Sequence, residues 1–96
     1  MKISVLKLAK DDLKEIHMYL SGFSEKTPDK FRESFKKFCT HVADTPYMYS
    51  QYKYNNLYRK AVIAYDYLIF YQVDEENDTV KIYRVLHGKR NAENFI

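Results

Sequence analysis

Apolar residues recur at steps of three and four in two consecutive segments of the first half of the chain. The first set is Ala9, Leu13, Ile16 and Leu20, with Phe23 three residues further on, and the second set is Phe31, Phe35, Phe38 and Val42. Each set lies along one side of a helix with 3.6 residues per turn. Because only a short polar segment separates the two sets, the pattern predicts a helical hairpin with an apolar seam.

The ends of the second helix carry local signals. Thr27 is a good N-cap residue, Pro28 suits the first helical position, and Asp29 complements the positive helix end. Pro46 should end the helix, because the residue before a proline avoids the α region.

The remaining segments are rich in β-forming residues or alternate apolar with polar positions. The expected strands span residues 2–7, 57–63, 65–73 and 80–87. Residues 47–56 have no clear period and read as an aromatic loop, 74–79 as a hairpin turn, and a turn without glycine is expected near Ala64–Asp66. The order is therefore β-α-α-β-β-β. It predicts an α+β fold in which the helical hairpin packs on one face of a small, mainly antiparallel sheet.

Composition limits the class of protein. With 96 residues, 46% of them hydrophobic, the chain suffices for one domain, expected over 1–96, and is too short for two. The single cysteine, Cys39, excludes a disulfide framework and a cysteine metal cluster. No apolar run approaches the roughly 20 residues of a membrane span, and charge appears too early for a signal peptide. We therefore expect a soluble cytoplasmic protein.

The small net charge of +3 conceals an uneven distribution. Residues 45–65 and 79–92 contain none of the 13 acidic residues and seven of the ten tyrosines. Their basic residues are Lys53, Arg59, Lys60, Lys81, Arg84, Lys89 and Arg90. Cations interleaved with aromatic rings suit nucleic acid and equally suit an acidic protein segment. A third interpretation is that strands simply favour tyrosine.

Several segments, in this order and spacing, resemble the RelE/ParE superfamily of toxin–antitoxin toxins over essentially the whole chain. They are Ile3-Ser4-Val5 followed by Ala9, Asp12, Leu13 and Ile16, then Tyr58-Arg59-Lys60, the run 67–73, and the run 80–91. The ending Val85-Leu86-His87-Gly88-Lys89-Arg90-Asn91 resembles the ParE branch in particular. The resemblance implies a small toxin that a cognate antitoxin neutralises. RelE-like toxins cut messenger RNA in the ribosomal A site, whereas ParE-like toxins inhibit DNA gyrase.

The residues that RelE-like toxins use for cleavage are only partly present. The resemblance places Arg59 at a sheet lysine of those enzymes and Arg90 at the arginine of their Gly-Lys-Arg motif. An expected arginine falls at Leu68, and the C-terminal tyrosine falls near Phe95 or Ile96, which have no hydroxyl group. This loss favours a gyrase inhibitor over an enzyme. If the chain is a ribosome-dependent mRNA endonuclease, the candidate catalytic residues are Arg59, Arg90, Lys60 and His87. A third alternative is an inactive homologue that acts only with its antitoxin.

The surface expected to bind the target or partner is basic and aromatic. It comprises Tyr58, Arg59, Lys60, Tyr83, Arg84, His87, Lys89 and Arg90. No metal or cofactor is expected, since His17 and His41 lack companions at ligand spacing, and Cys39 is interpreted as a small buried apolar residue. The acidic clusters at 11–15 and 74–78 are interpreted as helix-start and turn chemistry.

The expected partners follow from the same resemblance and charge pattern. They are the cognate antitoxin, whose acidic and apolar C-terminal segment folds on binding, and either DNA gyrase or the ribosome with mRNA. Operator DNA is expected to be contacted only through the antitoxin, and no membrane is expected.

Overall fold

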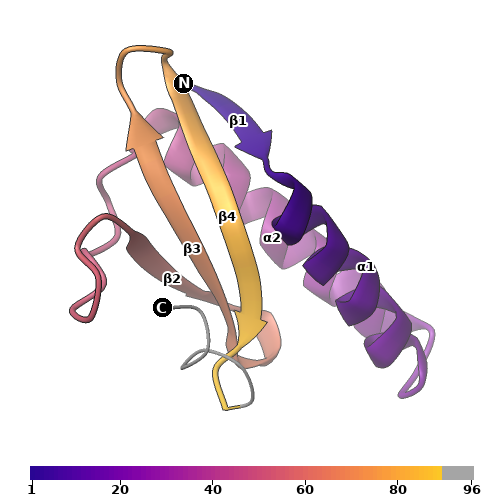
Figure 1. Cartoon of the computed structure of the whole chain (residues 1–96). Helices are drawn as coiled ribbons and strands as arrows, with labels where there is room; N and C mark the ends of the chain where they lie inside the picture. The colour runs from indigo at the N-terminus through magenta and orange to yellow at the C-terminus, as the bar shows by residue number, and fades with distance from the viewer. Residues whose placement is uncertain (90–96) are drawn as a thin grey trace.

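The computed structural model describes residues 1–89, and it confirms the predicted element order. The elements are β1 (Lys2–Val5), α1 (Lys7–Ser21), α2 (Lys26–Asp44), β2 (Arg59–Ile63), a 3-10 turn η1 (Ala64–Asp66), β3 (Tyr67–Asp74) and β4 (Thr79–His87). The sheet order is β1-β4-β3-β2, with β1 and β4 parallel and the other pairs antiparallel. Both helices cover the same face of this sheet (Figure 1). The predicted strand limits differ from these by at most two residues.

The core lies between the helical hairpin and the covered face of the sheet. The buried residues in it include Ala9, Ile16, Leu20, Phe31, Phe38 and Val42 from the helices, and Ala61, Tyr67, Ile69, Tyr71, Val80, Ile82 and Val85 from the strands. Leu13 and Phe35 are partly buried and pack against it. The predicted apolar seam is therefore confirmed for both helices. Neither helix is long and apolar enough to cross a lipid bilayer.

Phe23 does not belong to this seam, so its placement there was wrong. α1 ends at Ser21, two residues before Phe23, and the Phe23 side chain is 65% exposed. Once the helix has ended, the 3.6-residue spacing no longer determines the direction of a side chain. The ring of Phe23 instead contacts Tyr19, with centroids 5.2 Å apart.

The N-terminus of α2 also differs from the prediction, in which Thr27 was the cap. The helix begins at Lys26, and the hydroxyl of Ser24 accepts the hydrogen bond from the Thr27 backbone N–H at 3.2 Å. Ser24 thus satisfies a free N–H group of the first turn, which is the usual task of a capping side chain. The other end is as predicted, because α2 ends at Asp44 and Thr45, before Pro46, leaves the α region at φ −133° and ψ 74°.

The turn between β2 and β3 lies at Ala64–Asp66, where it was predicted, and contains no glycine. Tyr65 and Asp66 both adopt a left-handed backbone, with φ of 62° and 61°. Hydrogen bonds from two other elements hold the turn: Ala64 N–H donates to the Ser34 hydroxyl at 3.1 Å, and Gly88 N–H donates to the Asp66 carbonyl at 2.9 Å. These tertiary contacts offset the cost of a conformation that residues with a Cβ rarely adopt.

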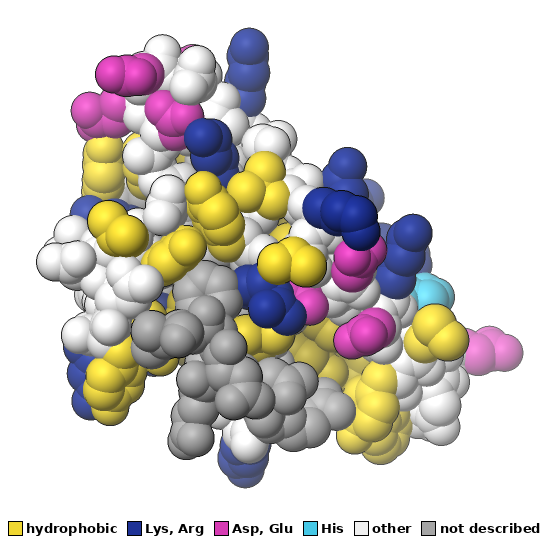
Figure 2. All heavy atoms as spheres, viewed as in Figure 1, with side chains coloured by type: hydrophobic (Ala, Val, Ile, Leu, Met, Phe, Trp, Pro, Cys, Tyr) yellow, Lys and Arg dark blue, Asp and Glu magenta, His cyan; other side chains and the backbone are white. Residues whose placement is uncertain are grey.

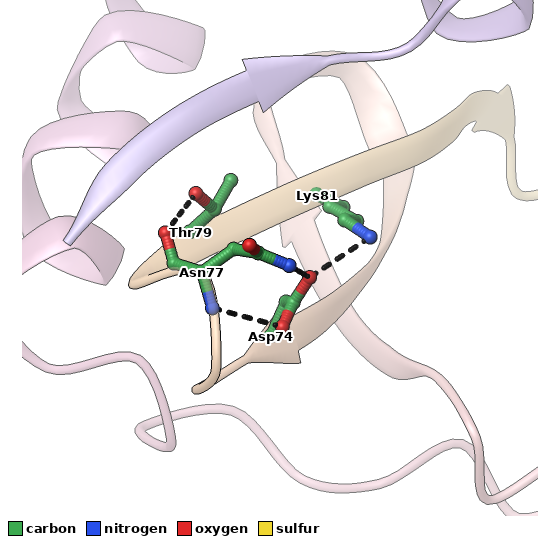
Figure 3. A network of polar contacts seen from close by, with 4 residues as sticks. All are labelled: Asp74, Asn77, Thr79 and Lys81. Atoms are coloured by element: carbon green, nitrogen blue, oxygen red, sulfur yellow. Dashed lines mark hydrogen bonds and ion pairs between the residues drawn. The ribbon is translucent and has the colours of Figure 1, made fainter.

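The β3–β4 turn is closed by the carboxylate of Asp74 (Figure 3). Asp74 accepts hydrogen bonds from the side-chain amide of Asn77 at 2.8 Å and its backbone N–H at 3.2 Å, and pairs with the Lys81 ammonium at 2.9 Å. The Thr79 hydroxyl donates to the Asn77 carbonyl at 2.8 Å. The prediction of turn chemistry for residues 74–78 is confirmed.

This network makes a pH-dependent contribution to stability. The hydrogen bond from the Asn77 side chain and the contact with Lys81 lower the pKa of Asp74 from 3.8 to about 2. A carboxyl whose pKa is lower in the folded state stabilises the fold above its unfolded pKa, and this stabilisation is lost as the pH falls through its folded pKa. We therefore expect Asp74→Asn to lower the urea midpoint at neutral pH, with the difference from wild type vanishing between about pH 4 and 2. Glu76→Gln, in the same turn, should show no such convergence.

Candidate functional site

The face of the sheet opposite the helices, called here the open face, carries a second apolar cluster. Its buried members are Tyr52, Phe70 and Leu86, and Tyr58 and Leu68 pack against them. Side chains alternate between the two faces of a strand, so Ile69 and Tyr71 point into the main core while Phe70 points the other way. The open face therefore has a small apolar centre, and polar residues surround it.

Three of the predicted site residues surround this centre. Lys60 pairs with Phe70 in the sheet register, and its ammonium lies 5.6 Å from the ring centroid of Tyr52. The rings of Tyr58 and Tyr83 meet edge to face, with centroids 5.2 Å apart. Tyr83 occupies a bulge, since Tyr71 pairs with Ile82 whereas Phe70 pairs with Arg84. Tyr58, Lys60 and Tyr83 are thus brought together on the open face.

Arg59 is directed away from them. Its register partner is Tyr71, which lies in the main core. The Arg59 guanidinium donates to the Tyr49 carbonyl at 2.7 Å and lies 4.8 Å from the ring centroid of Tyr47. The Tyr47 hydroxyl in turn donates to Glu75, and this hydrogen bond raises the pKa of Tyr47. Arg59 therefore secures residues 47–49 against the neighbouring strands.

Arg84 is held within the protein by a carboxylate of α1. Its Nε and Nη2 atoms donate to the two oxygens of Asp12 at 2.8 and 3.0 Å, and this contact raises the pKa of the guanidinium. Asp12 also accepts the backbone N–H of Val85 at 3.0 Å. Asp12 had been interpreted as helix-start chemistry, which is wrong for this residue. Its carboxylate instead joins α1 to β4, over 72 residues of sequence.

His87 lies at the other end of the sheet, beside α1. Its ring meets that of Tyr67 edge to face with centroids 5.1 Å apart, and its Nδ1 accepts the backbone N–H of Lys89 at 3.2 Å. His87, Tyr19 and Tyr67 line two adjoining hollows of about 240 and 300 Å³ between α1 and the end of β4. Lys89 is exposed, and Arg90 lies outside the described residues.

The candidate catalytic residues in the described part of the chain, Arg59, Lys60 and His87, do not converge on one point. Arg59 and His87 pair with Tyr71 and Tyr67 of β3, which places them about 13 Å apart along the strand direction at the usual rise per residue. Lys60 lies on the opposite face from Arg59. Acid–base cleavage requires its groups within hydrogen-bond reach of one reacting centre. Among residues 1–89, the predicted candidates do not form such a constellation.

The remaining candidates for site chemistry are accounted for by packing or exposure. Cys39 is partly buried against the core, and burial raises the pKa of its thiol to about 11, which disfavours the nucleophilic thiolate. His17 and His41 are exposed on the helices. Within residues 1–89, no group of three His, Cys, Asp or Glu side chains could hold a metal ion.

The tyrosine-rich stretches divide between packing and surface. Tyr52 is buried and Tyr49 packs against the main core, so these two are structural, whereas Tyr47, Tyr54 and Tyr65 are exposed. Figure 2 shows acidic side chains gathered at the β3–β4 turn at the top and on the helices at the right. The burial of Tyr52 was missed because it depends on packing against Phe70, which is distant in sequence. The continuous apolar run 67–71 was a signal that both faces of this strand are covered.

Comparisons with known proteins give one family and one fold. The sequence matches the family model described as the ParE toxin of the type II toxin–antitoxin system, parDE, over residues 3–92. The structure is similar to a chain of the intact E. coli RelBE toxin–antitoxin complex, with a TM-score of 0.67 and 16% identity over 93% of this chain and 98% of that one. No curated protein matches the sequence.

Two further structures show the same fold. The isolated E. coli RelE toxin matches with a TM-score of 0.67 and 16% identity, over 97% of this chain and 89% of that one. A chain of the chromosomal ParDE system from P. aeruginosa matches with a TM-score of 0.64 and 13% identity, over 91% of this chain and 95% of that one.

Proposed function

The chain belongs to the ParE family of type II toxin–antitoxin toxins, and from this membership we propose that it inhibits growth by binding DNA gyrase. As the toxin component of such a system, it has a cognate antitoxin as partner. The match to the ParE model over residues 3–92 is the observation that carries the gyrase proposal. The proposed contact residues are Tyr58, Lys60 and Tyr83 on the open face, together with Lys89 and Arg90, which follow β4 in the sequence.

The geometry of the predicted catalytic residues supports an inhibitor that acts by binding. Arg59 is engaged with a backbone carbonyl and an aromatic ring, and Lys60 lies on the opposite face of the sheet. Among residues 1–89, the predicted catalytic candidates are thus either used in the fold or placed apart from one another. A binding surface has no such requirement for convergence, because it needs only complementary shape and charge.

The antitoxin is proposed to bind through an acidic and apolar segment, which suits the acid-free residues 45–65. We place both partners in the cytoplasm, where gyrase acts on DNA.

A supercoiling assay with purified gyrase tests the proposal. Wild-type toxin should inhibit supercoiling, and Lys60→Glu should raise the concentration for half inhibition about tenfold, because it reverses a charge at the contact surface. Lys36→Glu, on the exposed side of α2, makes the same charge change and should leave inhibition unaltered.

The following outcomes would contradict the proposal. If wild-type toxin in excess leaves supercoiling unaffected, gyrase is not the target. Primer extension on translated messages would then distinguish the remaining functions, since cuts in the ribosomal A site would indicate a RelE-like endonuclease. Normal growth after induction without the antitoxin would indicate an inactive homologue.

A further inference from the structure

Residues 50–60 form a small hairpin that projects from the sheet and whose second arm runs into β2 (Figure 1). Gln51 and Arg59 form an antiparallel bridge, Tyr52 N–H donates to the Tyr58 carbonyl at 2.8 Å, and Lys60 N–H donates to the Ser50 carbonyl at 3.2 Å. The tip is closed by Asn55, whose N–H donates to the Tyr52 carbonyl at 3.2 Å. This segment, called here the Tyr/Lys hairpin, therefore has a defined conformation of its own.

The hairpin alternates cations with aromatic rings. The ammonium of Lys53 lies 4.7 Å from the ring centroid of Tyr54, and that of Lys60 lies 5.6 Å from the ring centroid of Tyr52. The two rings meet edge to face with centroids 5.4 Å apart. Tyr52 is anchored by Phe70 beneath it, whereas Tyr54 is 64% exposed. One ring is thus fixed on the sheet, and the other is exposed to solvent.

Between these side chains lies a hollow of about 230 Å³ with polar groups on its wall. Its lining consists of Ser50, Gln51, Tyr52, Lys53, Tyr54 and Lys60. Ser50 and Gln51 can donate and accept hydrogen bonds, as the edge of a nucleobase requires. The hollow is therefore suited to a flat, polar ring that carries a negative charge nearby.

The positive charge of the hairpin is not neutralised within the described part of the chain. Neither Lys53 nor Lys60 pairs with an acidic residue among residues 1–89, and residues 45–65 contain no Asp or Glu. Lys81 and Arg84, by contrast, are paired with Asp74 and Asp12. The two lysines of the hairpin thus remain available for an anion.

We propose that the Tyr/Lys hairpin binds single-stranded nucleic acid, with a base stacked on Tyr54 and phosphates on Lys53 and Lys60. Unpaired bases stack on exposed aromatic rings while neighbouring cations hold the backbone, and both elements are present here. An acidic peptide would satisfy the lysines but would leave the exposed ring of Tyr54 without a flat partner. In a duplex, the faces of the bases are stacked on their neighbours and cannot stack on Tyr54. Lys60 also belongs to the surface proposed for gyrase, and the hairpin lies within the stretch proposed for the antitoxin. Oligonucleotide binding is measured without either protein, so its result tests the hairpin alone.

Fluorescence anisotropy with the purified chain and labelled oligo-dT or oligo-rU tests this site. Tyr54→Ala should weaken binding about tenfold, whereas Tyr54→Phe keeps a ring that can stack and should restore it. Replacing Lys53 and Lys60 together by Gln should reduce the slope of log K against log salt by about 1.4, the value for two phosphate contacts on a single strand. Lys36→Gln should change neither quantity.

A contrary result would either overturn the proposal or assign the hairpin another role. Absence of oligonucleotide binding at low salt overturns the proposal. Competition by a poly-glutamate peptide, combined with no effect of Tyr54→Ala, would assign the hairpin to an acidic protein segment. Equal affinity for duplex DNA that is insensitive to Tyr54→Ala would indicate electrostatic attraction alone. Circular dichroism should verify that each variant is folded. We expect the Tyr54 variants to fold, because the Tyr54 side chain is exposed.

Discussion

Replacing Asp12 with alanine is expected to lower the free energy of unfolding by about 3 kcal/mol, because Asp12 is a buried carboxylate whose partners would lose their acceptor. The carboxylate accepts three hydrogen bonds, two from Arg84 and one from the Val85 backbone. The side chains of Asp12 and Arg84 are 10% and 27% exposed. Alanine leaves a half-buried guanidinium and a buried N–H group without acceptors, and both groups then carry their desolvation cost uncompensated.

The neighbouring residue provides a matched control. Asp11 pairs with Lys7 at 3.2 Å, but both side chains are well exposed to water. Exposed pairs of this kind contribute about 0 to 0.5 kcal/mol, so Asp11→Ala should change the urea midpoint little. Asp12→Asn keeps one side-chain carbonyl oxygen and should fall between the two alanine variants.

A double variant separates the net value of the pair from the cost of leaving one partner alone. Asp12→Leu with Arg84→Met replaces both charges by apolar side chains of similar length, so it should be more stable than Asp12→Ala. If Asp12→Ala and Asp11→Ala proved equally mild, the contact between α1 and β4 would not depend on this carboxylate.

The helices and strands were predictable because their signals are local. The spacing of Phe31, Phe38 and Val42, and the restriction that Pro46 places on Thr45, act within a few residues. The errors occurred where one of several adjacent polar residues had to be chosen, as with Ser24 rather than Thr27. The direction of Phe23 depended on the residue at which α1 ends, and such limits are the least certain part of a pattern.

The arrangement of the candidate site depended on pairings between distant residues. Arg59 and Lys60 are adjacent in sequence and therefore point to opposite faces, and only the sheet register determines which one meets Tyr52. The bulge at Tyr83 changes which face of the sheet the following residues of β4 point to. The alternation of apolar and polar residues along β4 did not reveal this bulge. The partner of Arg84 lies in α1, and charge alone could not distinguish a residue that binds a target from one that binds Asp12.

Phe38→Ala is expected to lower the free energy of unfolding by about 3 to 5 kcal/mol, which is typical of a large aromatic side chain removed from a core. Phe38 is 2% exposed and lies among other rings, with centroids 5.6 Å from both Tyr49 and Tyr71. These contacts join α2 to β3 and to the aromatic loop, so the cavity would affect three segments. If the alanine variant does not fold, Phe38→Leu retains most of the volume and should cost about 1.5 kcal/mol or less.

Phe23→Ala removes the same side chain from the position that the helical spacing had assigned to the seam. Its ring contacts Tyr19 at the end of α1 and is otherwise largely exposed. Such a pair contributes about 0.2 to 0.5 kcal/mol, so this variant should unfold close to the wild-type urea concentration. A loss comparable to that of Phe38→Ala would mean that Phe23 is buried in solution and that α1 continues past Ser21. The difference in stability between the Phe38→Ala and Phe23→Ala variants therefore tests where α1 ends. The end of α1 also separates the packed seam from the exposed rings beside His87.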